Sequence, residues 1–213
     1  MNRTFAPALA AVLALASCGP ADADNTAAPA SGASAPSGQD MPPIAQVGFN
    51  DLLRDPAAPF LGAENADVTI IGFVDYNCPY CKKMQPEIEG LLKADPKIRV
   101  LYKDWPIFGD ASEAAARTAL AAGYQGKYEA VHNAFMLSPS RIADQTEITR
   151  LAQSAGVDMA RLNQDMADHR AEIDAVLSRN NREALAMALQ GTPAFIINGN
   201  LIPGGLRGAS GRL

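Results

Sequence analysis

The sequence predicts an α/β fold that is built on a βαβ unit and carries a long helical insertion. The continuous apolar run at 68–74 is typical of a strand that is buried on both faces. A Cys-x-x-Cys motif links this run to residues 82–94, where apolar side chains recur at helical spacing. The Asp95-Pro96 pair ends that helix, and the apolar run at 98–102 predicts a second strand, joined to the first by a right-handed crossover.

The segment 109–190 separates this unit from a last apolar strand and is too long for a simple crossover. Its sequence predicts helices throughout. Asp110 with Glu113, and Asp144 with Glu147, are typical of capping boxes in which Asp replaces Ser or Thr. Two apolar stripes at helical spacing support the same prediction. They are formed by Ile148, Leu151, Ala152 and Ala155, and by Ile173, Val176, Leu177, Ala184, Leu185 and Leu189.

Composition and charge exclude several classes of protein. A length of 213 residues suits one domain, and 48% hydrophobic residues can form its core. The formal net charge of −5 and the lack of a basic run argue against a nucleic-acid partner, because phosphate contacts require clustered Lys and Arg. No metal site is expected, since the two histidines, His132 and His169, lack ligand spacing. His132 is expected on a helix surface.

Residues 1–17 are predicted to be an export signal. The apolar run at 5–16 follows Arg3 and is shorter than the roughly 20 residues of a membrane-spanning helix. The segment Leu15-Ala16-Ser17-Cys18 is similar to the lipobox of bacterial lipoproteins, in which the chain is cut before the cysteine and the cysteine carries lipid. Ordinary secretory cleavage nearby, which would leave Cys18 as a free thiol, is the alternative. On either reading we expect the protein outside the cytoplasm.

Residues 18–43 are predicted to form a flexible tether. They consist mainly of Ala, Pro, Ser, Gly and Asp and show no apolar period. Such a segment cannot bury enough surface to offset the entropy lost on ordering. A tether behind a lipidated Cys18 would hold a soluble domain away from the bilayer.

The Cys-x-x-Cys motif lies where a strand passes into a helix. Cys78 is expected at the helix start, and Pro79 at the first helical position, where its missing N–H costs nothing. The Cys78 sulfur would then face free backbone amides and the positive end of the helix dipole, which favours a thiolate. Cys78 is therefore predicted to be the reactive, exposed sulfur, with Cys81 as its partner.

Three segments resemble, in the same order, those of DsbA-like thioredoxin-fold disulfide oxidoreductases of bacterial envelopes. They are Phe-x-Asp-Tyr-Asn-Cys-Pro-Tyr-Cys at 73–81, Lys-Asp-Trp-Pro at 103–106 and Gly-Thr-Pro-Ala-Phe at 191–195. The resemblance implies a thioredoxin-like fold, with residues 44–108 and 191–213 as its two parts and the helical subdomain between them.

The same resemblance implies a function and its site residues. Cys78 and Cys81 would exchange disulfides with exported proteins, and Thr192-Pro193 would form a cis-proline loop that binds an extended substrate. A membrane redox partner would recharge the pair without a cofactor, in the periplasm and beside the membrane that holds the Cys18 lipid. An oxidase is the leading interpretation. A disulfide isomerase or reductase, and a tethered protein with a merely structural Cys78–Cys81 bridge, are the alternatives.

Some residues leave the interpretation open. Asp75 and Lys103 could ease proton transfer to Cys81, or they could be solvated charges. Gly72 occupies the position where many thioredoxin-fold enzymes have a buried acid. Residues 206–213 are too few and too Gly-rich for the helix that ends the family chain, which predicts an uncovered apolar patch, a covering partner or a truncated chain.

Overall fold

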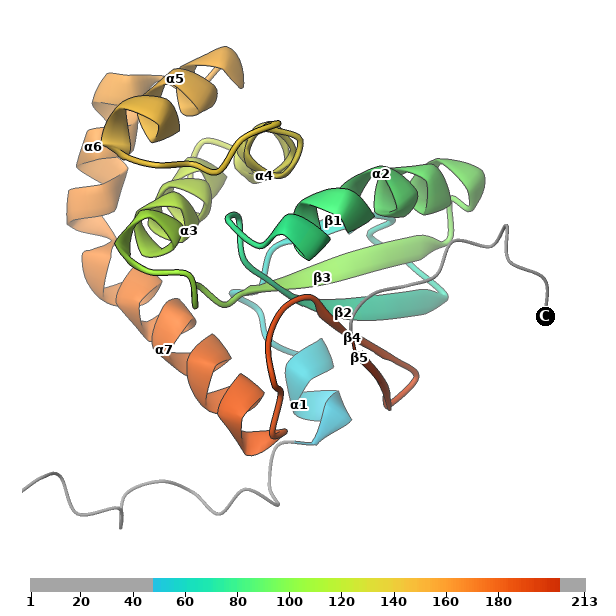
Figure 1. Ribbon diagram of the computed structural model, residues 1–213. Helices are drawn as coiled ribbons and strands as arrows, with labels where there is room; N and C mark the ends of the chain where they lie inside the picture. The colour runs from blue at the N-terminus through green and yellow to red at the C-terminus, as the bar shows by residue number, and fades with distance from the viewer. Residues whose placement is uncertain (1–47, 204–213) are drawn as a thin grey trace, which may run out of the picture. The chain divides into compact units, whose positions relative to one another are not determined.

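A five-stranded sheet forms the centre of the computed structural model, which describes residues 48–203 (Figure 1). The strands are β1 (Phe60–Gly62), β2 (Val68–Val74), β3 (Ile98–Asp104), β4 (Ala194–Ile197) and β5 (Asn200–Pro203), in the spatial order β1-β3-β2-β4-β5. The helices are α1 (Phe49–Leu53), α2 (Pro79–Ala94), α3 (Asp110–Gly123), α4 (Tyr128–Met136), α5 (Gln145–Ser154), α6 (Met159–Asp168) and α7 (Arg170–Ala186). Within residues 48–203, every helix is too short or too polar to serve as a membrane span.

The central strand and the βαβ unit agree with the sequence prediction. β2 lies between β3, to which it is parallel, and β4, to which it is antiparallel. Its apolar run is continuous because both of its faces are covered. The chain passes from β2 through α2 to β3. β3 extends two residues beyond the predicted end, to Asp104.

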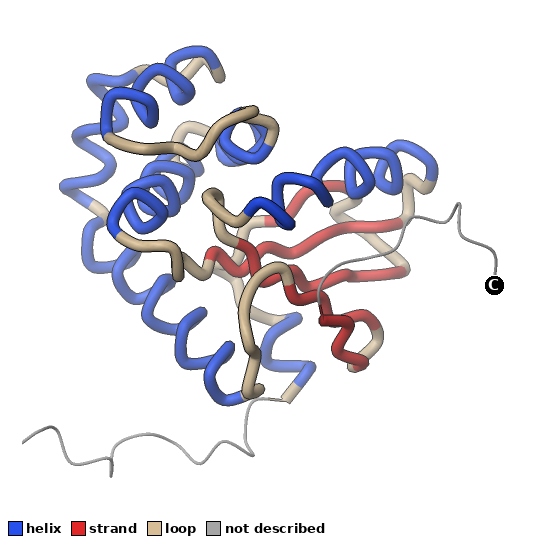
Figure 2. Tube along the Cα trace, viewed as in Figure 1, coloured by secondary structure: helices blue, strands red, loops and turns tan. Residues whose placement is uncertain are grey.

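Helices cover both faces of the sheet (Figure 2). Side chains on a strand alternate between the two faces. Ile70, Val100 and Phe195 therefore pack in the core beneath α2. Their neighbours in sequence belong to the second core, on the side of α1 and α7. These are Ile71, Leu101 and Ile196. A site at the start of α2 is thus built on the first face alone.

Five helices, α3 to α7, occupy the stretch between β3 and β4. Asp144 caps α5 as predicted, since its side chain accepts a hydrogen bond from the Glu147 N–H. The capping box at Asp110 is wrong, because Gly109 is the N-cap and Asp110 already belongs to α3. Leu185 is half-exposed, although it was predicted to face the core. Ala184 takes the core position at that turn of α7.

The predictions for the chain ends cannot be compared with the structure. The export signal at 1–17, the tether at 18–43 and the segment at 206–213 lie outside the described residues.

Lys103 is fully buried in an ionic cluster, so its prediction as a solvated charge is wrong. Its Nζ lies 2.6 Å from Asp55 Oδ2 and 2.8 Å from Glu183 Oε2. Arg179 Nε donates to Asp55 Oδ2 over 3.0 Å, and Arg179 Nη2 lies 2.9 Å from Asp55 Oδ1 as part of the same ion pair. These partners belong to the α1 and α7 side of the sheet, whereas Cys81 packs in the core beneath α2. The alternation of β3 therefore directs Lys103 away from Cys81.

We expect Asp55→Asn to destabilise the fold by about 3–5 kcal/mol, because it leaves the buried Lys103 and the partly exposed Arg179 short of negative charge. Urea denaturation measures the loss. Asp67→Asn is the matched control, since Asp67 forms an exposed pair of 2.8 Å with Lys97. Its expected cost is under about 1 kcal/mol. Equal losses in the two variants would contradict the assignment.

Candidate active site

The two cysteines lie at the start of α2, as predicted. Cys78 is the N-cap, Pro79 is the first helical residue, and Cys81 lies in the first turn. Both cysteines are free thiols. The main-chain N–H of Cys78 donates to the Asp75 carbonyl over 3.1 Å, which closes the turn between β2 and α2. The helix dipole and the free amides therefore point at the Cys78 sulfur.

Cys78 was predicted to be the exposed sulfur, but the structure buries it. Its exposed fraction is 1%, and that of Cys81 is 3%. The cause is a loop that lies far away in the sequence, because the Cys78 Sγ donates to the Thr192 carbonyl over 3.1 Å. The sulfur lies just beneath the surface, since Pro79 and Tyr80 are exposed. A cavity of about 410 Å³, lined in part by Thr192 and Pro193, adjoins this loop.

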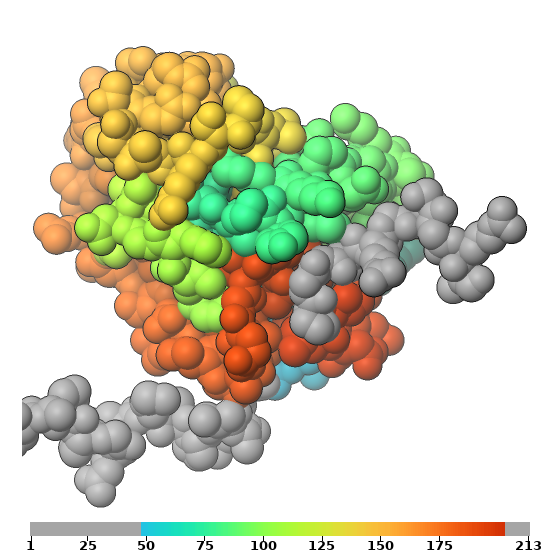
Figure 3. Space-filling view, in the orientation of Figure 1, coloured from blue at the N-terminus to red at the C-terminus, as the bar shows by residue number. Residues whose placement is uncertain are grey.

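The Thr192–Pro193 peptide bond is cis, as the resemblance implied. In Figure 3 the start of α2 lies where the segments that precede α3, α5 and β4 come together. The candidate site is thus enclosed by three loops, two of them from the helical insertion or its start.

The two thiols differ sharply in acidity. The pKa of Cys78 falls to about 6, mainly because the Cys81 thiol donates to it, and in spite of burial, which acts in the opposite direction. The nearby Thr192 side chain and hydrogen bonds from the main-chain N–H groups of Cys81 and Tyr80 lower the pKa of Cys78 further. Burial, and then the neighbouring Cys78, raise the pKa of Cys81 far above its usual value. One sulfur ionises near neutral pH, and the other keeps its proton.

Asp75 is buried, so its prediction as a solvated charge is also wrong. Its Oδ2 accepts from the N–H groups of Ile107 and Phe108 over 2.6 Å and 3.0 Å. Its Oδ1 accepts from Asn77 N–H over 2.7 Å and from the Ser112 hydroxyl over 2.8 Å. With four donors, the carboxylate has no acceptor site left for a proton relay. It fixes the turn before Cys78 to the start of α3.

Two further side chains hold the cysteine turn against the helical insertion, and sequence reasoning missed both. Asn77 donates through Nδ2 to the Ile142 carbonyl over 3.0 Å, and its Oδ1 accepts from Ile142 N–H over 2.8 Å. Lys82 Nζ donates to the carbonyls of Phe135 and Ser138 over 2.6 Å and 3.2 Å. Only the partners' positions in space show these roles, although Asn77 belongs to the segment that carried the resemblance.

His132 is fully buried, which corrects its prediction as a helix-surface residue. Its Nδ1 lies 3.1 Å from the Tyr76 hydroxyl, and its Nε2 lies 3.3 Å from Gln85 Oε1. Burial lowers its pKa to about 3, so the ring is neutral. The prediction failed because α4 packs against both α2 and α3, which leaves no solvent beside His132.

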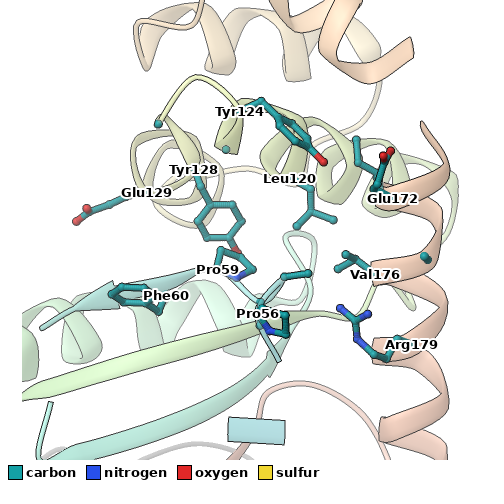
Figure 4. Close-up of a pocket in the computed structure, with 16 residues that line it drawn as sticks. Pro56, Pro59, Phe60, Leu120, Tyr124, Tyr128, Glu129, Glu172, Val176 and Arg179 are labelled. Atoms are coloured by element: carbon teal, nitrogen blue, oxygen red, sulfur yellow. The ribbon is translucent and has the colours of Figure 1, made fainter. Parts of the chain in front are cut away.

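Asp104 supplies a second buried carboxyl group near the site, and it was also missed. The Tyr128 hydroxyl lies 3.2 Å from each of its oxygens and 3.4 Å from the Tyr76 hydroxyl. Burial raises the pKa of Asp104 to about 7, although the two tyrosines lower it in part. Tyr128 also lines a cleft of about 770 Å³, where Figure 4 shows its ring reaching toward Pro59.

Gly72 has a structural reason to lack an acidic side chain. A Cβ added there would lie 3.0 Å from a ring carbon of Phe195, on the neighbouring strand β4. A carboxyl group would not fit against this ring without displacing it.

A Cys-x-x-Cys pair that follows a central strand, caps a helix and meets a cis-proline loop defines a thioredoxin-fold dithiol protein. The five helices between β3 and β4 define a particular branch of that class. The chain matches the sequence model of the DSBA-like thioredoxin domain over residues 69–209. It therefore belongs to the DsbA-like family of thiol:disulfide oxidoreductases, as the sequence resemblance implied.

Solved structures support this assignment. A thioredoxin-like oxidoreductase from Silicibacter pomeroyi is 42% identical, with a TM-score of 0.70 over 75% of this chain and 90% of that one. The thiol-disulfide exchange protein alpha-DsbA2 from Wolbachia pipientis is 29% identical, with a TM-score of 0.69 over 73% and 83% of the two chains. The catalytic domain of Proteus mirabilis ScsC is 28% identical, with a TM-score of 0.65 over 73% and 85%.

Curated relatives include two kinds of protein. The probable disulfide bond formation protein D of Bacillus cereus is 23% identical over 164 residues, which cover 71% of this chain and 75% of that protein. The Na(+)/H(+) antiporter NhaA 3 of Salinispora tropica is 27% identical over 140 residues, or 65% of this chain. The match spans only 21% of the antiporter's length.

We expect the Cys78 thiolate in the reduced protein to be half-titrated near pH 6, as followed by its ultraviolet absorbance. In Cys81→Ala the pKa of Cys78 should rise, because its strongest hydrogen-bond donor is lost. Tyr80→Phe is the control and should leave the midpoint unchanged, since Tyr80 acts through its main chain. A Cys78 midpoint that is unaffected by Cys81→Ala would show that the pairing is misassigned.

The raised pKa of Asp104 predicts a stability that falls as pH rises. In the folded state Asp104 holds its proton up to about pH 7, whereas the ordinary pKa of an Asp carboxyl is 3.8. The stabilisation is thus complete below pH 3.8 and lost through pH 7, at a total of about 4 kcal/mol. Asp104→Asn should remove most of this loss between pH 5 and pH 8 in urea denaturation. If the stability of Asp104→Asn depended on pH as that of the wild type does, the raised pKa of Asp104 would be refuted.

Proposed function

We propose that this protein oxidises dithiols in exported proteins, with Cys78 as the sulfur that clients attack and Cys81 as the sulfur that leaves. The contrast between the two thiols carries the proposal. Cys78 has a pKa of about 6 at a helix N-terminus, while burial keeps Cys81 protonated. In the reduced form of such a pair, one sulfur is a thiolate and the other is a thiol. Stabilising this reduced form makes the oxidised pair a stronger oxidant.

The reaction proceeds in two exchanges. A client thiolate attacks the Cys78 sulfur of the Cys78–Cys81 disulfide, a mixed disulfide forms, and Cys81 leaves. A second client thiolate then attacks the client sulfur of the mixed disulfide, the client disulfide closes, and Cys78 leaves as a thiolate. Two electrons pass from the client to the cysteine pair. Since electrons move only between sulfur atoms, no cofactor is required.

The loop at Thr192-Pro193 is proposed as the client-binding element. Its Thr192 carbonyl lies 3.1 Å from the Cys78 sulfur, so a chain laid along the loop would bring its own sulfur to Cys78. The adjoining cavity of about 410 Å³ has apolar walls that include Leu189 and Leu201. Main-chain pairing with an extended segment is a general mode of peptide recognition and suits clients of many sequences.

The expected oxidising strength follows from the pKa of Cys78. A shift from 9.0 to about 6 favours the reduced form by about tenfold at pH 7, or about 30 mV for a two-electron couple. The Pro-Tyr pair between the cysteines brings no cationic side chain. The couple should therefore lie below the roughly −120 mV of the strongest oxidants of this type.

We also propose that the protein works in the periplasm, exported by residues 1–17 and anchored through lipid on Cys18 behind the tether at 18–43. The composition of these segments supports this proposal. A periplasmic thioredoxin-like protein from Salmonella enterica is 31% identical, with a TM-score of 0.64 over 73% of this chain. A membrane redox partner would then restore the Cys78–Cys81 disulfide after each cycle.

The oxidised protein should convert a reduced dithiol peptide to its disulfide, as followed by mass spectrometry. Cys78→Ser should abolish the reaction, and Cys81→Ser, loaded with a client through a mixed disulfide, should hold that client longer. Refolding of a scrambled client tests the isomerase alternative. A Cys78–Cys81 bridge that exchanges with no thiol would leave only a structural role for the pair.

The reduction potential should depend on pH in two regimes. Below pH 6, reduction takes up two protons, and the potential falls by about 59 mV per pH unit. Above pH 6, Cys78 stays ionised, one proton is taken up, and the slope drops to about 30 mV per unit. Equilibration with glutathione buffers from pH 5 to pH 8 measures both slopes. A single slope of about 59 mV throughout would disprove the Cys78 assignment.

A further inference from the structure

A chain of hydrogen-bonding side chains connects the end of β3 with the turn that holds Cys78. Asp104 is the last residue of β3, and the Tyr128 hydroxyl of α4 lies 3.2 Å from each of its carboxyl oxygens. The same hydroxyl lies 3.4 Å from that of Tyr76, which comes two residues before Cys78. All three side chains are buried. The exchange steps described above use none of them.

The chain continues beyond Tyr76 in a fixed direction. The Tyr76 hydroxyl lies 3.1 Å from His132 Nδ1, and His132 Nε2 lies 3.3 Å from Gln85 Oε1. Gln85 Nε2 donates to Asn133 Oδ1 over 2.8 Å, so the Gln85 oxygen is the atom left to accept from His132. The neutral His132 ring therefore carries its one hydrogen on Nε2. Its Nδ1 is then an acceptor, and the Tyr76 hydroxyl donates to it.

The number of hydrogens in this chain depends on Asp104. The chain has five contacts, but without a proton on Asp104 it has only four hydrogens to fill them. These come from Tyr76, Tyr128, His132 and Gln85. A protonated Asp104 donates to Tyr128, which frees the Tyr128 hydrogen for Tyr76, and every contact is filled. An ionised Asp104 instead attracts the tyrosine hydrogens, and one contact of Tyr76 is left without a hydrogen.

Asp104 changes its charge near neutral pH. Burial raises its pKa to about 7, Asp75 raises it as well, and the two tyrosine hydroxyls lower it. The charge of Asp104 also acts on Tyr102, on the same strand. From α7, the uncharged Asn180 donates to the Asp104 main-chain carbonyl, and Lys103 lies on the opposite face of the sheet. The missing hydrogen therefore appears within the pH range of thiol exchange.

Tyr76 is the residue through which the cysteine turn contacts α4. Both partners of its hydroxyl lie on α4, and its ring packs edge-on against two rings of that helix. The neighbours of Tyr76 are fixed elsewhere, Asp75 at the start of α3 and Asn77 at Ile142. The Tyr76 hydroxyl is thus the part of the turn whose hydrogen bonding depends on Asp104.

We propose that Asp104 and Tyr128 are positioning residues for thiol exchange, which hold Tyr76 and the cysteine turn firmly to α4 only while Asp104 keeps its proton. This inference rests on the proposed exchange reaction. When Asp104 gives its proton to water, Tyr76 loses one hydrogen bond to α4. A client sulfur must approach Cys78 in line with the disulfide, so a turn that is held less firmly is attacked more slowly. One net hydrogen bond corresponds to about a fivefold change in rate.

Asp104→Asn is the decisive variant, because its amide is neutral and can donate to Tyr128 at every pH. The rate is that of a client with one thiol attacking the oxidised protein, corrected for the ionised fraction of that thiol. In the wild type it should fall about fivefold between about pH 5 and pH 9, with its midpoint near pH 7. Asp104→Asn should keep the faster rate throughout. Tyr76→Phe removes the link and should keep the slower rate throughout.

Tyr102→Phe is the matched control. Tyr102 is fully buried, and its ring centroid lies 4.1 Å from that of His132, but its hydroxyl is not part of the chain. This variant should keep the fivefold step of the wild type, which separates loss of the chain from loss of any buried hydroxyl nearby. Stopped-flow single turnovers measure the rates, and thermal unfolding reports on the fold.

Nitrogen NMR tests the direction of the chain without a client. The protein has two histidines, so a His169→Gln variant assigns the His132 signals. The His132 ring should be neutral with its hydrogen on Nε2. Its signals should shift with a midpoint near pH 7 in the wild type and stay constant in Asp104→Asn. A hydrogen on Nδ1 would overturn the proposal, because the chain would then be complete with an ionised Asp104.

Two kinetic results would also overturn the proposal. One is a wild-type rate without a step, and the other is a step that persists in Asp104→Asn. If Asp104→Asn does not fold, Tyr76→Phe decides, since a step that persists in that variant is equally fatal. A wild type that exchanges with no client refutes the proposed function instead, and the NMR shift of His132 then tests the change in hydrogen bonding by itself.

Discussion

One buried carboxylate, that of Asp75, organises the region on which the chemistry depends. The two carboxylate oxygens accept four hydrogen bonds from three separate segments. The main-chain carbonyl of Asp75 accepts a fifth from the Cys78 N–H. Burying a fully hydrogen-bonded charge costs little free energy of folding. Without its donors, the same buried charge would destabilise the fold by roughly several kcal/mol. The loop at 105–109, the start of α3 and the cysteine turn therefore keep a single arrangement relative to one another.

Burial and hydrogen bonding have opposite effects on the pKa of a thiol, and their balance differs between two sulfurs that are only three positions apart. Both are buried, and burial alone would raise the pKa of each. At Cys78 the helix start supplies free N–H groups and Cys81 supplies a thiol donor, so hydrogen bonding outweighs burial. Cys81 lies in the first turn of α2, and there burial outweighs the hydrogen bonds that the sulfur accepts. Position along a helix thus separates a thiolate from a thiol.

The two faces of the sheet differ in their buried charged groups: an ionic cluster lies on one face, and a carboxyl group beside hydroxyl groups lies on the other. Lys103 and its partners neutralise one another on the side of α1 and α7 and join segments that are distant in sequence. Asp104, the next residue, points to the other face, where tyrosine hydroxyl groups contact its carboxyl group and burial raises its pKa. Adjacent residues on one strand therefore have opposite electrostatic roles, because alternate side chains enter different cores.

The sequence by itself determined the central strand, the helix that Cys78 caps and the second strand of the βαβ unit, since these depend on local order. It did not predict α1, β1 or β5. The resemblance of three segments, in the same order, to those of DsbA-like proteins also indicated the family. Only the tertiary structure decided burial and partners. His132 and Lys103 are polar, yet packing encloses them, and Cys78 is covered by a loop more than a hundred residues away in the chain. Hydrogen bonds and desolvation depend on neighbours in space, and periodicity does not record which distant segments become those neighbours.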